Sequence, residues 1–176
     1  YHPQFRAAKE SEKFDGCSAF GNLLPLLRKR VAEDLSCRQM TRERTIAGII
    51  RLLDLGLVRV GNEAYSRLNN SFGATTLRKR HAKVSGSSVL LRYKGKSGQL
   101  RQLSLTDRNL ARFVRKMQDL PGQNLFQYVG DDDDRRSIGS SEVNAYIEET
   151  MGHHFTAKNF RTWHASALAF AILADG

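Results

Sequence analysis

Hydrophobic residues recur at helical spacing in the first part of the chain. Between Ser18 and Leu35 they fall one helical turn apart, at Phe20, Leu23, Leu24, Leu27, Val31 and Leu35, which predicts a helix with one buried face. Pro25 lies within this stretch, so we expect the helix to kink or restart there. Residues 1–16 lack such a pattern and are predicted to form an irregular linker.

A second helix is predicted to begin after Thr41, because the threonine hydroxyl can cap the first turn. Its apolar stripe consists of Ile46, Ile49, Ile50, Leu53 and Leu57. Gly56 lies near the end of this stripe and is a typical residue at which a helix ends.

After Gly73 the pattern changes to short runs rich in strand-forming residues. These runs are Thr75–Val84, Ser88–Tyr93 and Leu100–Leu105, and turns containing Gly and Ser separate them. They predict a three-stranded antiparallel sheet. The tip of its second hairpin would carry Lys94 and Lys96.

After the sheet, three helices are predicted, and the acidic residues Asp131–Asp134 are predicted to form a loop. One helix begins at Thr106 or Asp107 and ends at Leu120, a second runs from Ser140 or Ser141 to Met151, and a third, capped by Thr156, reaches Ala174. The buried face of the last helix is predicted to consist of Phe160, Trp163, Ala167 and Phe170. The expected fold class is therefore α+β, mainly α-helical with one small three-stranded antiparallel sheet.

The distribution of charge is the first indication of function. The 176 residues carry a formal net charge of +10, and the block from Leu77 to Lys116 contains one acid, Asp107. Its basic residues are Arg78, Lys79, Arg80, Lys83, Arg92, Lys94, Lys96, Arg101, Arg108, Arg112, Arg115 and Lys116. A block of this kind favours polyanionic partners, so it predicts binding to a nucleic-acid backbone in preference to a merely solvated basic face.

The same sequence argues against several other classes of function. No apolar run approaches the ~18–20 residues of a membrane-spanning helix, so no membrane partner is expected. Cys17 and Cys37 are too few for a disulfide framework and are not spaced as zinc ligands, so no metal site is expected. The GKS triplet at 95–97 ends like a P-loop, but Leu90 stands where that motif needs its first glycine. We therefore expect no cofactor.

Three further motifs occur in a fixed order along the chain. The first is LVRVGNE at 57–63, continuing to Tyr65; the second is YKGKS at 93–97; the third is FTAKNFRTWHAS at 155–166. Together they resemble the catalytic domain of a type IB DNA topoisomerase of the small bacterial and poxvirus kind. The similarity runs from about Phe14 to Ala174 and implies the fold that this family shares with the tyrosine recombinases.

The resemblance also implies roles for individual residues. Arg59 and Arg161 match the two arginines that bind the scissile phosphate, and Lys96 matches the hairpin lysine that acts as general acid. Tyr65 and Lys158 match supporting positions that contact phosphates. The family cleaves one strand of duplex DNA through a 3′-phosphotyrosine and reseals it without ATP, which relaxes supercoils. Forked guanidiniums suit this chemistry because they bind phosphate oxygens in pairs.

The chain also departs from the family pattern. The family has a catalytic histidine and the nucleophilic tyrosine after the third motif, and neither follows it here. The tyrosines of this chain lie in other contexts, so we expect none of them to be the nucleophile: Tyr1, Tyr65, Tyr93, Tyr128 and Tyr146. Residues 17–176 are interpreted as a catalytic domain without its C-terminal segment and without the N-terminal clamp domain. The chain as written is expected to bind DNA without cleaving it.

Two alternatives remain open from the sequence. A tyrosine recombinase or integrase shares the chemistry, although that family usually has histidine where Lys158 stands, three residues before its second arginine. A non-catalytic nucleic-acid-binding module could use the same basic block. The expected partner is double-stranded DNA, bound by a monomer, and the expected location is the cytoplasm, in association with the nucleoid.

Overall fold

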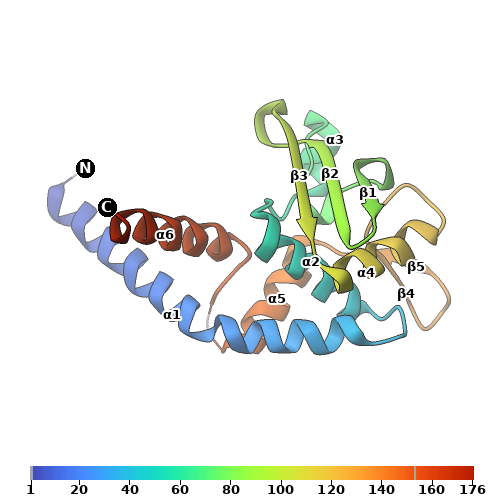
Figure 1. Cartoon of the computed structure of the whole chain (residues 1–176), viewed down its shortest axis with the longest axis horizontal. Coiled ribbons are helices and arrows are strands. Elements are labelled where there is room, and N and C mark those ends of the chain that lie inside the picture. The colour runs from blue at the N-terminus through green and yellow to red at the C-terminus, as the bar shows by residue number, and fades with distance from the viewer. Residues whose placement is uncertain (1, 153) are drawn as a thin grey trace.

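The computed structural model describes residues 2–152 and 154–176, and Tyr1 lies outside this described part. Its α-helices are α1 (Pro3–Ser36), α2 (Arg42–Gly56), α3 (Glu63–Asn69), α4 (Arg108–Asp119), α5 (Ser140–Met151) and α6 (Lys158–Ala174). Its strands are β1 (Ala82–Ser85), β2 (Ser88–Lys94), β3 (Leu100–Thr106), β4 (Gln127–Val129) and β5 (Arg135–Ser137). The fold is thus mainly helical with a small antiparallel sheet, as predicted (Figure 1).

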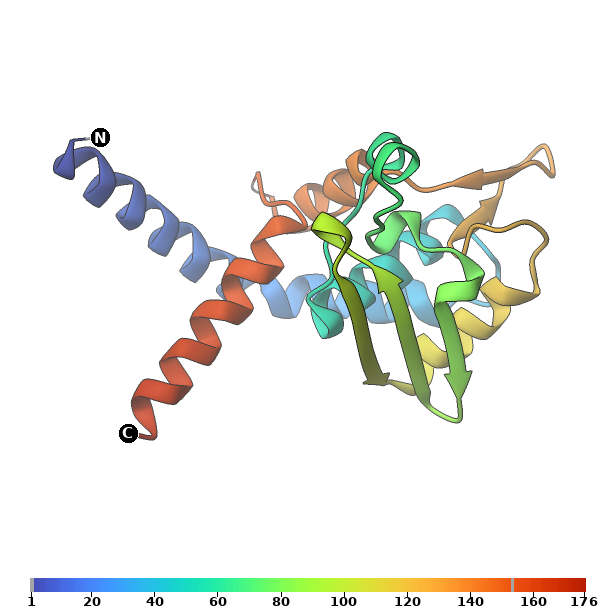
Figure 2. The ribbon, with the colours of Figure 1, turned by 90° about the horizontal axis from the view of Figure 1, so that it is seen from above.

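The main sheet has the strand order β1-β2-β3, and each neighbouring pair is antiparallel. Alternate side chains on β2 and β3 point into the core, where Val89, Leu91 and Leu105 are buried. Helix α4 packs against β1 and β2 and contributes a fully buried Phe113. The tip of the β2–β3 hairpin lies at the opposite end of β3 from the start of α4 (Figure 2).

Helix caps explain two of the correctly predicted helix starts. Thr41 caps α2 by accepting a hydrogen bond from the Arg44 backbone N–H, and Asp107 caps α4 by accepting one from Leu110. Helix α2 ends at Gly56. The next residue, Leu57, adopts the left-handed conformation with a φ of 52°, which a glycine usually adopts after a helix.

The prediction that residues 1–16 are irregular is wrong, because α1 begins at Pro3 and runs without interruption to Ser36. His2 caps this helix, and the segment that follows is rich in Ala, Lys and Glu, which favour helices without needing a buried face. Pro25 lies inside α1 and removes one backbone hydrogen bond. The axis of α1 bends partway along its length (Figure 1).

Three smaller differences concern short elements. Half of the segment predicted as the first strand, Thr75–Val84, lies in two 3₁₀ turns, at Ala74–Thr76 and Lys79–His81, and the strand itself is confined to 82–85. Helix α3 was not predicted. The acidic residues 131–134 do form a turn, but this turn joins two three-residue strands, β4 and β5, that their sequences do not signal.

The predicted buried face of α6 is correct only near its start. Phe160 is 1% exposed and Trp163 is half-buried, but Phe170 is 75% exposed. The reason is that α6 packs on α1 near the body of the molecule, and the two helices then diverge (Figure 2). Within the described residues, no helix has both the length and the hydropathy needed to cross a bilayer.

Candidate active site

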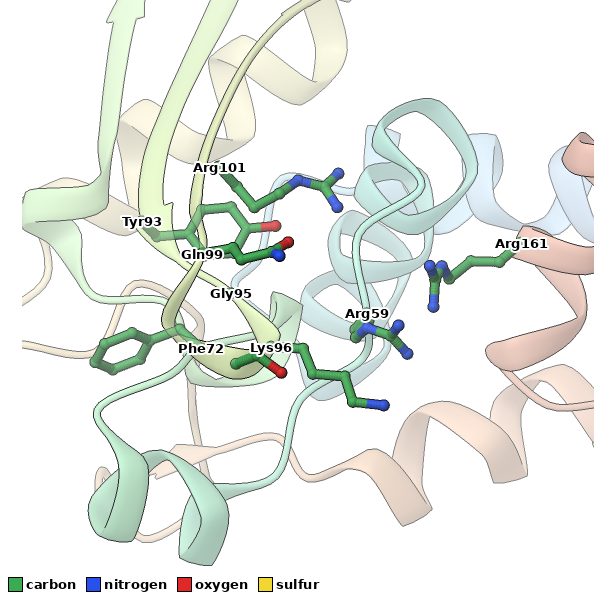
Figure 3. A pocket seen from close by; sticks show the side chains of 9 residues that line it. Arg59, Phe72, Tyr93, Gly95, Lys96, Gln99, Arg101 and Arg161 are labelled. Atoms are coloured by element: carbon green, nitrogen blue, oxygen red, sulfur yellow. The ribbon is translucent and has the colours of Figure 1, made fainter.

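Three of the predicted site residues line one cavity. Arg59, Lys96 and Arg161 come from the segment after α2, from the β2–β3 hairpin and from the first turn of α6 (Figure 3). The cavity has a volume of about 220 Å³. Its other lining residues are Phe72, Tyr93, Gly95, Ser97, Gln99 and Arg101. No carboxylate is among the residues that line it.

Backbone hydrogen bonds hold the segment that carries Arg59. The Arg59 carbonyl accepts from the Ala74 N–H at 2.7 Å, and the Val60 carbonyl accepts from both the N–H and the hydroxyl of Thr75 at 2.8 Å. These bonds require the two segments to approach closely at Gly73, where a Cβ would overlap backbone atoms of Gly61 and the Arg59 carbonyl oxygen. Arg59 is therefore fixed at its Cα while its side chain stays exposed.

A tight turn carries Lys96 at the tip of the β2–β3 hairpin. The Gly95 N–H donates to the Gln99 carbonyl at 2.8 Å, and Ser97 adopts a φ of 61°. The turn is joined to the region below it by a hydrogen bond of 2.7 Å from the Phe72 N–H to the Lys94 carbonyl. Lys96 is exposed, and its side chain extends beside that of Arg59 (Figure 3).

A charge network centred on the buried Asp54 anchors the helix that carries Arg161. Arg28 of α1 donates two hydrogen bonds to Asp54 of α2, at 2.8 and 2.9 Å, and His164 Nε2 of α6 lies 3.0 Å from Asp54 Oδ1. Asp54 is only 5% exposed. Burial disfavours its ionised form, but the hydrogen bonds from Arg28 and His164 outweigh burial and lower the pKa of the carboxyl group. The network ties α6 to α1 and α2 one turn beyond Arg161.

The cavity concentrates positive charge without neutralising it. Within the described part of the chain, Arg59, Lys96 and Arg161 form no ion pair. Burial, followed by the positive charges of Arg59 and Arg101, lowers the pKa of the Arg161 guanidinium. An anion between these side chains would relieve their mutual repulsion, and paired guanidiniums have the geometry that phosphate oxygens accept.

The other two predicted site residues do not line this cavity. Tyr65 lies on α3 with 45% of its surface exposed. Lys158 lies in a separate groove of about 930 Å³ between α1 and α6, which it shares with Arg161, Trp163 and Phe170. The side chains of Tyr65 and Lys158 are exposed to solvent, and neither forms part of the cavity wall.

Four polar residues of the cavity wall were not predicted as site residues: Tyr93, Ser97, Gln99 and Arg101. Arg101 and Tyr93 lie directly opposite each other in the β2–β3 register, both beside the hairpin tip. The predicted hairpin could have indicated that Arg101 and Tyr93 are neighbours, because residues at equal distances from a turn pair across the two strands. Burial raises the pKa of the Tyr93 hydroxyl, against the opposing effect of Arg101 and Arg161.

A buried histidine below the cavity predicts a pH dependence of stability. His81 Nδ1 accepts a hydrogen bond from the Arg78 N–H at 2.9 Å, and its ring packs on Phe72 at 4.5 Å between centroids. Burial, then the charges of Arg80 and Arg78, lower the pKa of His81 from 6.5 to about 4. Between these two values the unfolded chain binds more protons, so the free energy of unfolding falls as the pH drops from 6.5 to 4, by up to roughly 1.4 kcal/mol per pH unit.

The contribution of His81 can be measured by urea unfolding of the wild type and of His81→Asn across this pH range. Asparagine keeps a hydrogen-bond acceptor for Arg78 but does not titrate. The free energy of unfolding of this variant should therefore fall less steeply with decreasing pH than that of the wild type. The matched control is His154→Asn, because the His154 side chain is 96% exposed. Identical slopes for His81→Asn and the wild type would show that His81 contributes nothing.

Candidate metal ligands are not gathered anywhere in the described residues: no group of three or more His, Cys, Asp or Glu side chains is placed to hold an ion.

Comparison with known proteins gives a consistent family assignment. The family described as "Eukaryotic DNA topoisomerase I, catalytic core" matches residues 2–175. DNA topoisomerase 1B of Acanthamoeba polyphaga mimivirus is 36% identical over 163 residues, which cover 89% of this chain and 48% of that protein. DNA topoisomerase 1 of Mycosarcoma maydis is 25% identical over 187 residues, which cover 96% of this chain and 18% of that protein. The chain thus spans less than half the length of either relative.

A solved structure shows the same fold. The XerH site-specific recombinase bound to its difH substrate, in a pre-cleavage complex, superposes with a TM-score of 0.53 over 81% of this chain and 41% of that chain. The sequences are only 13% identical, so this likeness concerns the arrangement of helices and strands alone.

Proposed function

The chain belongs to the family of the eukaryotic DNA topoisomerase I catalytic core, the type IB DNA topoisomerases, and from this premise we propose that it binds duplex DNA and supplies the phosphate-binding and proton-donating groups for transient cleavage of one strand. The observation that carries the proposal is the cavity in which Arg59, Lys96 and Arg161 meet without a carboxylate. A phosphodiester requires cations of this kind as partners for its charged oxygens, whereas a neutral substrate would leave them without a counter-charge.

The proposed reaction assigns a separate task to each group. A tyrosine hydroxyl loses its proton to water, its oxygen attacks the phosphorus in line, a bond forms between them, and the bond from phosphorus to the 5′-oxygen breaks. Arg59 and Arg161 stabilise the negative charge that develops on the non-bridging oxygens. Lys96 donates a proton to the departing 5′-oxygen. Resealing reverses these steps, and the phosphotyrosine keeps the energy of the broken bond, so ATP is not required.

The tyrosine nucleophile is not assigned to this chain. Tyr146 is buried and donates a hydrogen bond of 2.6 Å to Asp34, so its hydroxyl is not free to reach a DNA strand. We propose that Tyr65 and Lys158 contact phosphates on either side of the cleaved one. This fits their exposed positions outside the cavity.

The proposal predicts a strong salt dependence of DNA binding. Affinity for a short duplex should fall linearly on a log–log plot against salt concentration, with a slope of about −0.9 for each phosphate contacted. Fluorescence anisotropy of a labelled duplex measures this slope. A slope near zero would contradict phosphate binding by the basic residues.

Sequence preference should be weak, since contacts to phosphates position a protein without reading bases.

Relaxation of a supercoiled plasmid tests the catalytic part of the proposal. The reaction should proceed in the full-length protein with EDTA present and ATP absent, and SDS should trap a covalent complex. Binding without relaxation or trapping in the full-length protein would instead favour a non-catalytic nucleic-acid-binding module.

A further inference from the structure

We propose that Arg101 is a third phosphate-binding arginine of the cavity, contacting the DNA backbone together with Arg59 and Arg161. The inference rests on the proposed function, because it assumes that the cavity receives a phosphate. It adds to that function a residue that lies outside the three motifs and that the sequence placed only in the basic block, with no role in the site.

The position of Arg101 in the sheet is unusual for a charged residue. Along β3 the inward positions are Arg101, Leu103 and Leu105, which alternate with the exposed Leu100, Gln102, Ser104 and Thr106. Leu103 and Leu105 pack into the core, so Arg101 continues an apolar row with a cation. Its guanidinium points from the end of this row toward the space between Arg59 and Arg161 (Figure 3).

No partner in the described residues neutralises this cation. Arg101 forms no ion pair and no side-chain hydrogen bond there, and the lining of the cavity includes no acid. Its charge acts on Arg161, whose pKa it helps to lower after burial and Arg59. A half-buried cation that faces two others is unfavourable on its own. A phosphate shared among the three would turn this repulsion into attraction.

A purely structural role for Arg101 has to be separated from binding. The aliphatic stem of Arg101 passes over Gly95, where a Cβ would lie 3.1 Å from Arg101 Cγ, so the side chain also covers the hairpin turn. Arg101→Met keeps an unbranched stem of similar length and removes the charge. Arg101→Lys keeps a charge without the fork. Arg101→Gln is a second neutral variant.

The experiment measures binding of these variants to a labelled DNA duplex by anisotropy across a series of KCl concentrations. Arg101→Met should weaken binding roughly tenfold near 0.1 M salt and should reduce the slope of the log–log plot by about 0.9. Arg101→Lys should keep the slope while binding more weakly than the wild type. The matched control is Arg38→Met, because Arg38 is exposed and does not line the cavity.

The outcomes separate this inference from the proposed function. Thermal melting identifies the variants that remain folded. If Arg101→Met does not fold, Arg101→Gln is used in its place. If the neutral Arg101 variants bind like Arg38→Met while Arg59→Met and Arg161→Met lose affinity and slope, Arg101 is not a phosphate ligand and the proposed function stands. If all three arginine positions behave like the control, the phosphate site itself is wrong.

Discussion

Replacing Arg161 by alanine in the full-length protein should lower the rate of DNA strand cleavage by about 100- to 1,000-fold, which corresponds to about 3–4 kcal/mol of transition-state stabilisation. Arg161 lines the cavity from a helix that is fixed by burial and by the Asp54 network, so it is preorganised for the charge that develops on phosphorus. Single-turnover cleavage of a DNA duplex, followed by the amount of covalent complex, measures the rate.

Two controls decide whether Arg161 acts in the reaction or only in binding. Arg161→Lys keeps the charge but loses the paired hydrogen bonds, so it should recover binding more completely than cleavage. Arg38→Ala, at an exposed position outside the cavity, should cleave like the wild type. If Arg161→Ala cleaves at nearly the wild-type rate once DNA is saturating, then Arg161 only anchors the substrate.

Phe20→Ala should destabilise the folded chain by about 3–5 kcal/mol, the usual cost of deleting a fully buried phenyl ring. Phe20 has no exposed surface and meets two rings edge-on, with centroid distances of 5.4 Å to Phe155 and 5.2 Å to Phe160. The substitution would remove packing between α1 and the start of α6, close to Arg161. Urea unfolding, extrapolated to water, gives the free energy of unfolding.

Phe170→Ala is the matched control for this prediction. It removes the same group from α6, but from a side chain that is 75% exposed, so the change should stay within about 0.5 kcal/mol. A similar loss for the two variants would mean that the start of α6 is no better packed than its end.

Much of the fold was predictable because local signals agreed with tertiary packing. The starts of α2 and α4 combine a side-chain cap, at Thr41 and Asp107, with an apolar stripe that is in fact buried. The hairpin at Lys96 combines strand-forming residues with a glycine turn. Where only one kind of signal was present, prediction failed: residues 3–16 have helix propensity without a stripe, and β4 and β5 are only three residues each.

The site was predictable only as far as its motifs reach. Arg59, Lys96 and Arg161 lie in the three motifs, and the structure brings them to one cavity. Arg101 lies outside the motifs, and its inward orientation depends on the register of β3 against β2. The failure at Phe170 has another cause, because an apolar residue on a helix shows that a face could be buried but does not reveal whether a neighbouring element covers it.

The supports of the two predicted phosphate-binding arginines differ in kind. Moving Arg59 would break the backbone hydrogen bonds at Ala74 and Thr75 and disturb the close approach at Gly73. Moving Arg161 would break the contact between His164 and Asp54 and pull the buried Phe160 away from Phe20. Backbone groups thus fix the position of Arg59, whereas side chains of other residues fix that of Arg161. A single substitution at Phe20 or Asp54 should therefore displace Arg161 while Arg59 stays in place.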